Sequence, residues 1–407
     1  MGLITVDQAL SGGSNLLTIL LVAHVLSPED FGLFTIFFLI YSLATTGLRS
    51  LVSGPLLVHP HEADRAPGEV IGTGVAVSLL MAAVCFVAGL ALAGPSPSLG
   101  RGLLILAVLL PLLLVQDLGR FVSWAVRRPG RSVWLDATWL VVEVAAFAAI
   151  LLSGRHLDLI GCILVWAGSG ALSGLLVFTQ YPALKLREVN LRWLRGHWDF
   201  SWKYLVSTFV TQGAVLVGAA MIAAISSAAA VAAVRAVTLL TRPGAAVKNA
   251  IGQSLVTDVA REDPRGSDLW RHVRRGIAIT TLAAIVNTGA LLLLDDRVGR
   301  LILGKTWPLA AVLVVPAGLQ LLADALATGT RETIIARKEI GLVVWIDVGG
   351  SVLWVLASGI GAAVAGAPGV VWAGVVAETI RAALWWAFFL RRLPRWNAAT
   401  RVSVPAA

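Results

Sequence analysis

The chain has 407 residues, of which 57% are hydrophobic and 14% are charged, and its mean hydropathy is +0.84. Soluble domains carry roughly 25% charged residues, so a chain this apolar could not cover its own surface, and lipid must cover it instead. The formal net charge of +9 raises the alternative of a nucleic-acid partner. The basic residues, however, lie in short loops between apolar runs, a distribution typical of membrane proteins that excludes a nucleic-acid face.

Apolar runs long enough to cross a bilayer, which takes roughly 20 residues per helix, follow one another along the chain. We expect about twelve spans, over residues 9–26, 31–58, 70–94, 102–126, 133–153, 160–183, 204–225, 231–256, 276–294, 298–326, 341–363 and 370–390. A turn over residues 365–369 (AGAPG) separates the last two. The sequence therefore predicts an all-α integral membrane protein.

The basic residues predict the orientation of these spans. With the N-terminus placed inside, about 22 Lys and Arg fall on the cytoplasmic side and about five on the outer side, following the positive-inside rule. The inner clusters lie at residues 127–131, 185–195, 261–275, 331–338 and 391–395. Both termini are therefore expected in the cytoplasm, and the chain in the bacterial cytoplasmic (inner) membrane.

One cytoplasmic stretch divides the chain near its middle. Leu186, Val189 and Trp193 recur at helical spacing, and Trp193, Trp198 and Trp202 suit headgroup depth. We therefore expect an N-terminal six-helix bundle over 1–184, an amphipathic cytoplasmic linker over 185–203, and a C-terminal six-helix bundle over 204–407. Because six spans return the chain to its starting side, the two bundles are predicted to be parallel repeats.

Polar side chains within spans are costly unless they are paired or hydrated, and they are therefore candidates for function. Four helices carry them on one face, at spacings of three or four residues. The candidates for a shared central cavity are Asp7, Ser11, Asn15 and Thr18 in the first span, Arg49 in the second, Ser207, Thr211 and Gln212 in the seventh, and Arg235, Arg242, Asn249 and Gln253 in the eighth.

Arg242 is the strongest single candidate, because it lies roughly 16 Å into its predicted span, near the middle of the membrane. Pro243 removes a backbone donor beside it and predicts a kink. The alternative is a structural arginine paired with a carboxylate. Arg49 and Arg235 lie nearer the helix ends, where snorkelling to the headgroups is the alternative, and Lys248 is expected to be structural.

The acidic residues leave more alternatives open. Two acid–base pairs are spaced i,i+3 and are expected to neutralise each other within a helix: Asp117 with Arg120, and Glu378 with Arg381. Asp136 is expected at the cytoplasmic edge beside Arg131. Glu143 lies two turns deeper on the same face, where it could be a protonation site that couples transport to an ion, or the partner of Arg242.

Enzyme and metal motifs are missing from the sequence. It contains no Walker, HExxH or GxSxG pattern, and His59 and His61 lie in a loop without further ligands nearby. Cys85 and Cys162 both lie inside apolar runs and are expected to be buried small residues. We expect no catalytic residue, no metal and no cofactor, and hence not an enzyme.

Residues 7–33, DQALSGGSNLLTILLVAHVLSPEDFGL, resemble the opening of the polysaccharide (Wzx-like) flippases. That family belongs to the multidrug/oligosaccharidyl-lipid/polysaccharide exporter superfamily. The resemblance implies a MATE-like fold, with two parallel six-helix bundles around a central cavity. It also implies movement of a polyprenyl-pyrophosphate-linked oligosaccharide from the inner to the outer leaflet by alternating access, for surface polysaccharide biosynthesis. Membrane lipids, and the glycosyltransferases and polymerase of such a pathway, are the implied partners.

The residues supply a physical motive for that function. Arg242, flanked by Arg49 and Arg235, would bind the phosphates as planar donor forks, while hydroxyl and amide groups bond the sugars. One alternative is a multidrug-type exporter of cationic small molecules, which predicts a carboxylate-rich, aromatic cavity. Another is a non-transporting scaffold of a glycan-assembly complex, which predicts that the polar stripes can be mutated without effect.

Overall fold

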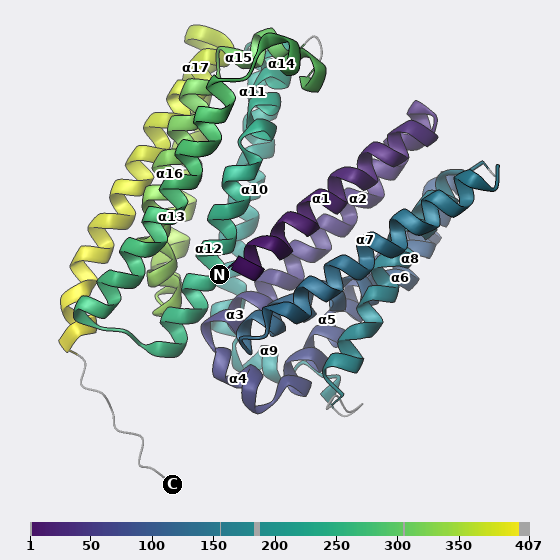
Figure 1. Cartoon of the computed structure of the whole chain (residues 1–407), viewed down its shortest axis with the longest axis horizontal. Coiled ribbons are helices and arrows are strands. Elements are labelled where there is room, and N and C mark those ends of the chain that lie inside the picture. The colour runs from purple at the N-terminus through teal and green to yellow at the C-terminus, as the bar shows by residue number, and fades with distance from the viewer. Residues whose placement is uncertain (1, 155, 183–187, 304–305, 399–407) are drawn as a thin grey trace. The chain divides into compact units, whose positions relative to one another are not determined.

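The computed structural model describes residues 2–154, 156–182, 188–303 and 306–398 (Figure 1). These residues are almost entirely helical, and no strand occurs among them. The chain divides into two compact units, Met1–Leu205 and Val206–Ala407, which are described separately below. The all-α class predicted from the sequence is confirmed.

Six long helices form the described part of the first unit: α1 (Gly2–Val25), α2 (Pro28–Leu48), α5 (Pro67–Leu92), α6 (Pro97–Ala125), α7 (Pro129–Leu152) and α8 (Leu159–Gln180). Four of the six begin with proline within their first two residues and a fifth, α8, is capped by Asp158, which accepts a hydrogen bond from the Gly161 amide. Proline suits a helix start because the amide it lacks would have no intrahelical partner there. A buried core of large apolar side chains, including Trp166 and Phe34, holds the helices together.

The second predicted span is α-helical at both ends and contains a π-helical turn between them. Helix α2 continues without interruption into a π-helical turn, η1 (Arg49–Ser53), and then into α3 (Gly54–Val58). A π turn adds one residue and rotates the following side chains around the helix axis, and such turns are frequent at functional sites. Two short helices, α4 (Pro60–Arg65) and α9 (Arg192–Gly196), complete the unit.

The linker predicted over 185–203 is partly different in the structure. Residues 185–187 lie outside the described residues, and the helical part consists of the five residues of α9 followed by the start of α10 (Trp198–Ile225). Trp193 is buried, and its indole nitrogen donates to Glu62 over 2.6 Å. It therefore anchors α9 on the first unit, whereas Trp198 and Trp202 are exposed.

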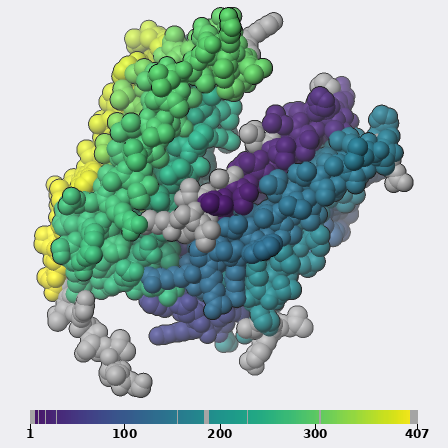
Figure 2. Space-filling view, in the orientation of Figure 1, coloured from purple at the N-terminus to yellow at the C-terminus, as the bar shows by residue number. Residues whose placement is uncertain are grey.

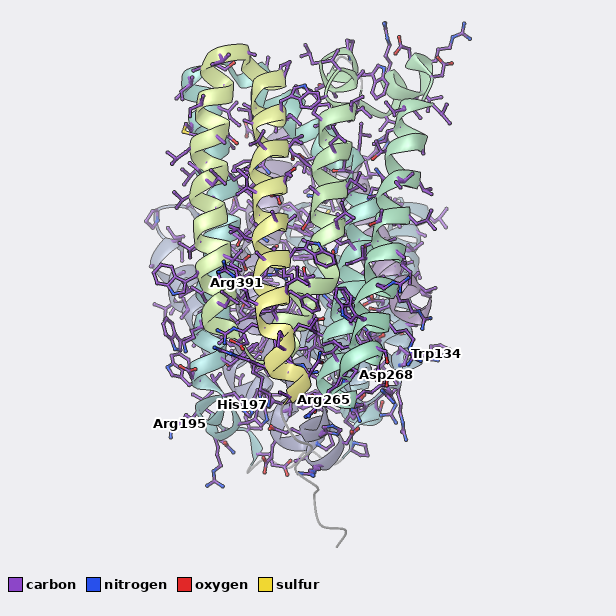
Figure 3. All side chains as sticks on the ribbon, turned by 90° about the vertical axis from the view of Figure 1, so that its left-hand side faces the viewer. Trp134, Arg195, His197, Arg265, Asp268 and Arg391 are labelled. Carbon is purple, nitrogen blue, oxygen red and sulfur yellow. The ribbon has the colours of Figure 1, made fainter. Side chains whose placement is uncertain are left out.

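The second unit contains the greater part of α10, together with α11 (Ala228–Leu240), α12 (Arg242–Glu262), α13 (Gly266–Leu292), α14 (Asp296–Leu303), α15 (Trp307–Ala311), α16 (Val314–Ala336) and α17 (Ile340–Ala398). Helix α17 consists of two limbs separated by non-helical residues Ala365 and Gly366 (Figure 3). Gly366 has a φ of 60°, a left-handed conformation that glycine adopts freely. The turn predicted over 365–369 is therefore confirmed.

Nine helices within the described ranges are long and apolar enough to cross a membrane, or ten if the bent pair α11 and α12 forms one span. Helix α17 is counted once in that number, although it consists of two limbs. The span predicted over 298–326 is wrong: α14 and α15 occupy its first half, and the long helix is α16, which begins at 314 and ends at 336. Pro308 lies in the first turn of the short helix α15. The breaks between α14, α15 and α16 are not visible in the hydropathy of the sequence. Arg331, expected in a cytoplasmic loop, consequently lies within α16.

Candidate functional site

The polar centre of the first unit is a buried arginine that joins three helices. Arg120, on α6, has a side chain only 3% exposed. Its Nη2 lies 2.8 Å from Asp7 of α1, its Nη1 lies 3.3 Å from Asp117 one turn earlier, and its Nε lies 3.3 Å from Asp136 of α7. Ser11 accepts a further bond from Nη1 over 3.2 Å. The buried charge of Arg120 is tolerated because each nitrogen of its guanidinium has an acceptor nearby.

Arg49 meets the same cluster from η1. Its Nε and Nη2 donate to the two oxygens of Asp117 over 2.8 and 2.6 Å, a bidentate pair. The Arg49 side chain is nevertheless 42% exposed, whereas Asp117 is buried. Arg49 thus links the cluster to the accessible surface. The i,i+3 pairing expected between Asp117 and Arg120 is confirmed, but Asp117 is shared with Arg49.

Glu143 of α7 is buried and accepts a hydrogen bond from Thr18 of α1 over 2.5 Å. Its second oxygen, Oε2, is buried without a hydrogen-bond partner among the described residues. Asp136, two turns away, does not lie beside Arg131 as expected: it contacts Arg120 and accepts from Gln116 over 2.9 Å. The prediction for Asp136 is wrong because it used the nearest cation along the chain, while the fold supplies a closer one from α6.

The second unit contains a corresponding network. Asp324 of α16 pairs with Lys248 of α12 and lies 3.7 Å from Arg381 of α17, which in turn pairs with Glu378 over 2.6 Å. The expected pair of Glu378 with Arg381 and the structural role expected for Lys248 both agree with these contacts. Sequence spacing gave no signal for the link through Asp324, because its partners lie on other helices.

A second group in this unit centres on Asp347 of α17. Ser207 of α10 donates to Asp347 over 2.6 Å, and Arg331 of α16 reaches the same oxygen at 3.2 Å. Thr211, one turn beyond Ser207, donates to the Ser207 carbonyl over 2.7 Å. The polar stripe predicted on the seventh span is thus partly used to join helices within the unit.

Two adjoining cavities, of about 210 and 250 Å³, lie among the helices of the second unit. They share the residues Val234, Thr238, Gln320, Trp354 and Glu378. The larger cavity is also lined by Thr211, Arg235 and Arg381. Among its three charged side chains, Glu378 and Arg381 form an ion pair, which leaves Arg235 as the uncompensated charge.

Arg235 and Arg242 lie on either side of a bend. Helices α11 and α12 meet at Thr241 at an angle of 53°, which confirms the kink predicted beside Pro243. Arg242 is therefore the first residue of α12 instead of a mid-helix residue. Both arginines are exposed, and neither forms an ion pair with any residue that the structure describes. Gln212 and Asn249 are also exposed, whereas Gln253 is half-buried.

The predicted candidates thus fall into separate groups. In the first unit, Asp7, Ser11 and Arg49 belong to the Arg120 cluster, Thr18 contacts Glu143, and Asn15 is half-buried. In the second unit, Thr211 and Arg235 line one cavity. Among the residues that sequence reasoning did not include as site residues are Arg120, Asp117 and Arg381. Their charge inside apolar runs was the available signal.

Comparison with known proteins identifies the fold. No family model matches the sequence, and no curated protein matches it. Among solved structures, the chain is similar to a MATE transporter in the bent conformation, with a TM-score of 0.79, 13% identity, and coverage of 97% of this chain and 94% of that one.

An outward-facing multidrug resistance MATE family transporter of the MOP superfamily gives a TM-score of 0.77 at 13% identity, with the same coverage. A MOP superfamily transporter from Pyrococcus furiosus, described as having a binding pocket of reverse polarity, gives 0.73 at 12% identity, again over 97% and 94% of the two chains. The MATE-like fold predicted from the sequence is confirmed. With its long apolar helices, the chain is a multi-pass membrane protein.

Proposed function

We propose that this chain is a membrane transporter that moves a polyprenyl-pyrophosphate-linked oligosaccharide from the inner to the outer leaflet of the bacterial cytoplasmic membrane by alternating access. The shared fold supports the transporter part of the proposal. The observation that carries the substrate class is the uncompensated positive charge of Arg235 in the larger cavity of the second unit, with Arg242 following across the bend.

The two arginines that line the larger cavity differ in how their charge is balanced. Arg381 forms an ion pair with Glu378 over 2.6 Å and lies near Asp324, so its charge is largely balanced within the protein. Arg235 has no such partner among the described residues, and a free guanidinium offers a planar fork of donors that suits phosphate oxygens. A volume of about 250 Å³ accommodates a phosphate-sized group, while the glycan and the lipid tail would extend beyond it.

Arginines at this position would lower the free-energy cost of moving a pyrophosphate through the bilayer. Moving a single charged side chain to the bilayer centre costs about 2.5–17 kcal/mol, and a pyrophosphate carries more than one charge. The guanidiniums of Arg235 and Arg242 would replace part of the lost hydration. The Thr211 hydroxyl and the Gln212 amide of the second unit would bond the sugars. Arg49 adds a half-exposed guanidinium in the first unit.

A multidrug-type exporter is the second candidate. It is favoured by the fold and by the presence of Glu378 and Trp354 in the cavities, since a carboxylate and an aromatic ring suit an organic cation. Against it, Glu378 is already neutralised by Arg381. A non-transporting scaffold for the glycosyltransferases and polymerase of a glycan pathway is the third candidate, and it requires none of these side chains.

Complementation separates the three candidates. In a bacterial strain lacking its own copy of this protein, wild type should restore surface-glycan staining, and inserted Arg235→Ala and Arg242→Ala proteins should fail to do so. Arg297→Ala is the matched control, because Arg297 is an exposed arginine of α14 in the same unit. Full export by both the Arg235→Ala and the Arg242→Ala protein at wild-type protein levels contradicts the proposal. Drug sensitivity without any glycan defect would favour the exporter.

The driving force is a separate part of the proposal. We assign the coupling role to Glu143, because its Oε2 is buried without a partner in the described chain and could take a proton or a cation. Glu143→Gln should then abolish export while leaving the protein inserted. Export that continues at the wild-type rate in this variant would leave the membrane potential as the driving force.

A further inference from the structure

The first turns of α13, a green helix at the surface of the second unit in Figure 2, carry a group of arginines. Arg271 is 74% exposed and pairs with Asp268, which lies at the lower end of the unit in Figure 3. Arg274 and Arg275 are also exposed, and neither forms an ion pair with a residue in the described ranges. Together with Ser267 and Trp270, the three arginines line one open hollow.

This hollow continues into an apolar groove. The two share Arg274 and Ala278, and the groove runs on along α13 past Leu282 and Ile285, both exposed by more than half. Residues 270, 274, 278, 282 and 285 follow one another at spacings of three and four, so they occupy one face of the helix. The opposite wall is formed by Leu326 of α16 and Trp386 of α17.

Aromatic rings form the wall of the groove beside the arginines. Trp270 and Trp386 are stacked with ring centroids 6.2 Å apart, and Phe389 packs edge-on against both. The Trp386 indole nitrogen donates to the Leu326 carbonyl over 3.0 Å, which holds the ring in place between helices. Tryptophan is enriched at the level of the lipid headgroups, where one edge of its ring is apolar and the other polar.

The length of α13 places the arginines at the membrane surface. Its 27 residues extend about 40 Å, whereas the hydrocarbon core is about 30 Å thick. The excess corresponds to roughly seven residues. Because Arg271, Arg274 and Arg275 lie in the first ten residues, their side chains can reach the headgroups while Leu282 and Ile285 lie in the hydrocarbon.

We infer that this arginine–tryptophan groove is a binding site for an anionic glycerophospholipid, with the phosphate held by Arg274 and Arg275 and one acyl chain lying along Leu282 and Ile285. Along one face of α13, arginines and a tryptophan are followed by apolar side chains. This order matches the order of phosphate, glycerol and acyl chain in a lipid. A second copy of the chain would bring three arginines against three, and free phosphate would leave the apolar groove uncovered. The inference does not depend on the transported substrate.

Native mass spectrometry of the full chain in detergent tests the site, with dioleoylphosphatidylglycerol and dioleoylphosphatidylcholine as probes. Each basic residue near an anionic lipid surface contributes about a fivefold gain in affinity. Arg274→Gln with Arg275→Gln should therefore weaken phosphatidylglycerol binding about 25-fold. Binding of phosphatidylcholine, whose choline cation offsets the phosphate charge, should weaken by much less. Ile285→Trp, which keeps every charge but fills the groove, should also weaken phosphatidylglycerol binding.

The control is Arg297→Gln, which removes an exposed arginine beyond the opposite end of α13 and should retain wild-type binding. The inference is overturned if wild type does not prefer phosphatidylglycerol, or if the double variant binds it as wild type does. Binding of inorganic phosphate as tight as that of phosphatidylglycerol would show an anion site without a lipid role and would also overturn it, as would a dimer in place of bound lipid.

Discussion

Removing Arg120 tests the account of the first unit most sharply. In Arg120→Gln, Asp117 keeps its bidentate contact with Arg49, and Asp136 keeps the amide of Gln116. Asp7 is different, because both hydrogen bonds to its carboxylate come from Arg120, over 2.8 and 3.2 Å, and its side chain is fully buried. The substitution therefore leaves two buried carboxylates without a cation: Asp136, which keeps a hydrogen bond from Gln116, and Asp7, which also loses both of its hydrogen bonds.

The expected cost follows from that count. Breaking a buried ion pair by removing one partner destabilises a protein by about 3–5 kcal/mol, whereas an exposed pair is worth about 0–1 kcal/mol. We expect Arg120→Gln to lower the free energy of unfolding by about 3–5 kcal/mol. In the double variant with Asp7→Asn one of the two uncompensated charges is gone, so the loss should be smaller than in Arg120→Gln alone, a non-additive result typical of direct contact.

The assay is unfolding of the purified protein in mixed micelles by increasing sodium dodecyl sulfate, followed by tryptophan fluorescence. Arg101→Gln is the control, since Arg101 lies exposed in the first turns of the same helix and should change stability by less than about 0.5 kcal/mol. A loss below about 1 kcal/mol in Arg120→Gln, or strict additivity in the double variant, would refute the reasoning.

Three further predictions concern other parts of the chain. Gly174→Ala should destabilise the first unit by about 1–3 kcal/mol, because a Cβ there would lie 2.2 Å from the Leu112 carbonyl oxygen of α6. The control is Gly168→Ala on the same helix, where a Cβ meets no atom within 4 Å. This variant should be neutral or stabilising in the same unfolding assay. Ser207→Ala, which removes the hydrogen bond to Asp347, should cost about 1.5–3 kcal/mol in the same assay, the value of a hydrogen bond to a charged group. Partial burial raises the pKa of Asp263, but hydrogen bonds and charge from Arg265 and Arg337 outweigh this and lower the pKa below its usual 3.8. Because the folded-state pKa is depressed, the stabilisation is full above the ordinary value and is lost as pH falls through the folded pKa. Asp263→Asn should therefore be less stable than wild type at pH 7, and the difference should vanish at strongly acidic pH; a constant difference would contradict this.

Features set by local chemistry were predictable from the sequence. Pro243 removes a backbone donor and breaks the eighth span, and the glycines of residues 365–369 allow the tight turn in α17. The i,i+3 pairs were predictable for the same reason, since helical geometry brings such residues together whatever the tertiary structure. Long apolar runs fixed the fold class.

Contacts between distant residues were not predictable in this way. Arg120 and Asp7 are 113 residues apart, and no periodic pattern marks two residues that meet only when α1 packs beside α6 and α7. The π turn that begins at Arg49 has no clear sequence signature, yet it precedes the contact with Asp117. The start of α16 was misplaced because α14 and α15 contribute apolar residues without forming a span.

The central claim is that the guanidinium of Arg235 serves an anionic lipid-linked substrate, and transport in proteoliposomes tests it most directly. Purified protein would be reconstituted with a fluorescent polyprenyl-pyrophosphate glycan in one arm and with ethidium in the other. The account predicts that wild type moves the glycan lipid and that Arg235→Gln slows this at least tenfold, about 1.4 kcal/mol at the transition state, with Arg235→Lys in between. Transport of ethidium without the glycan lipid, unaffected by Arg235→Gln, would contradict it.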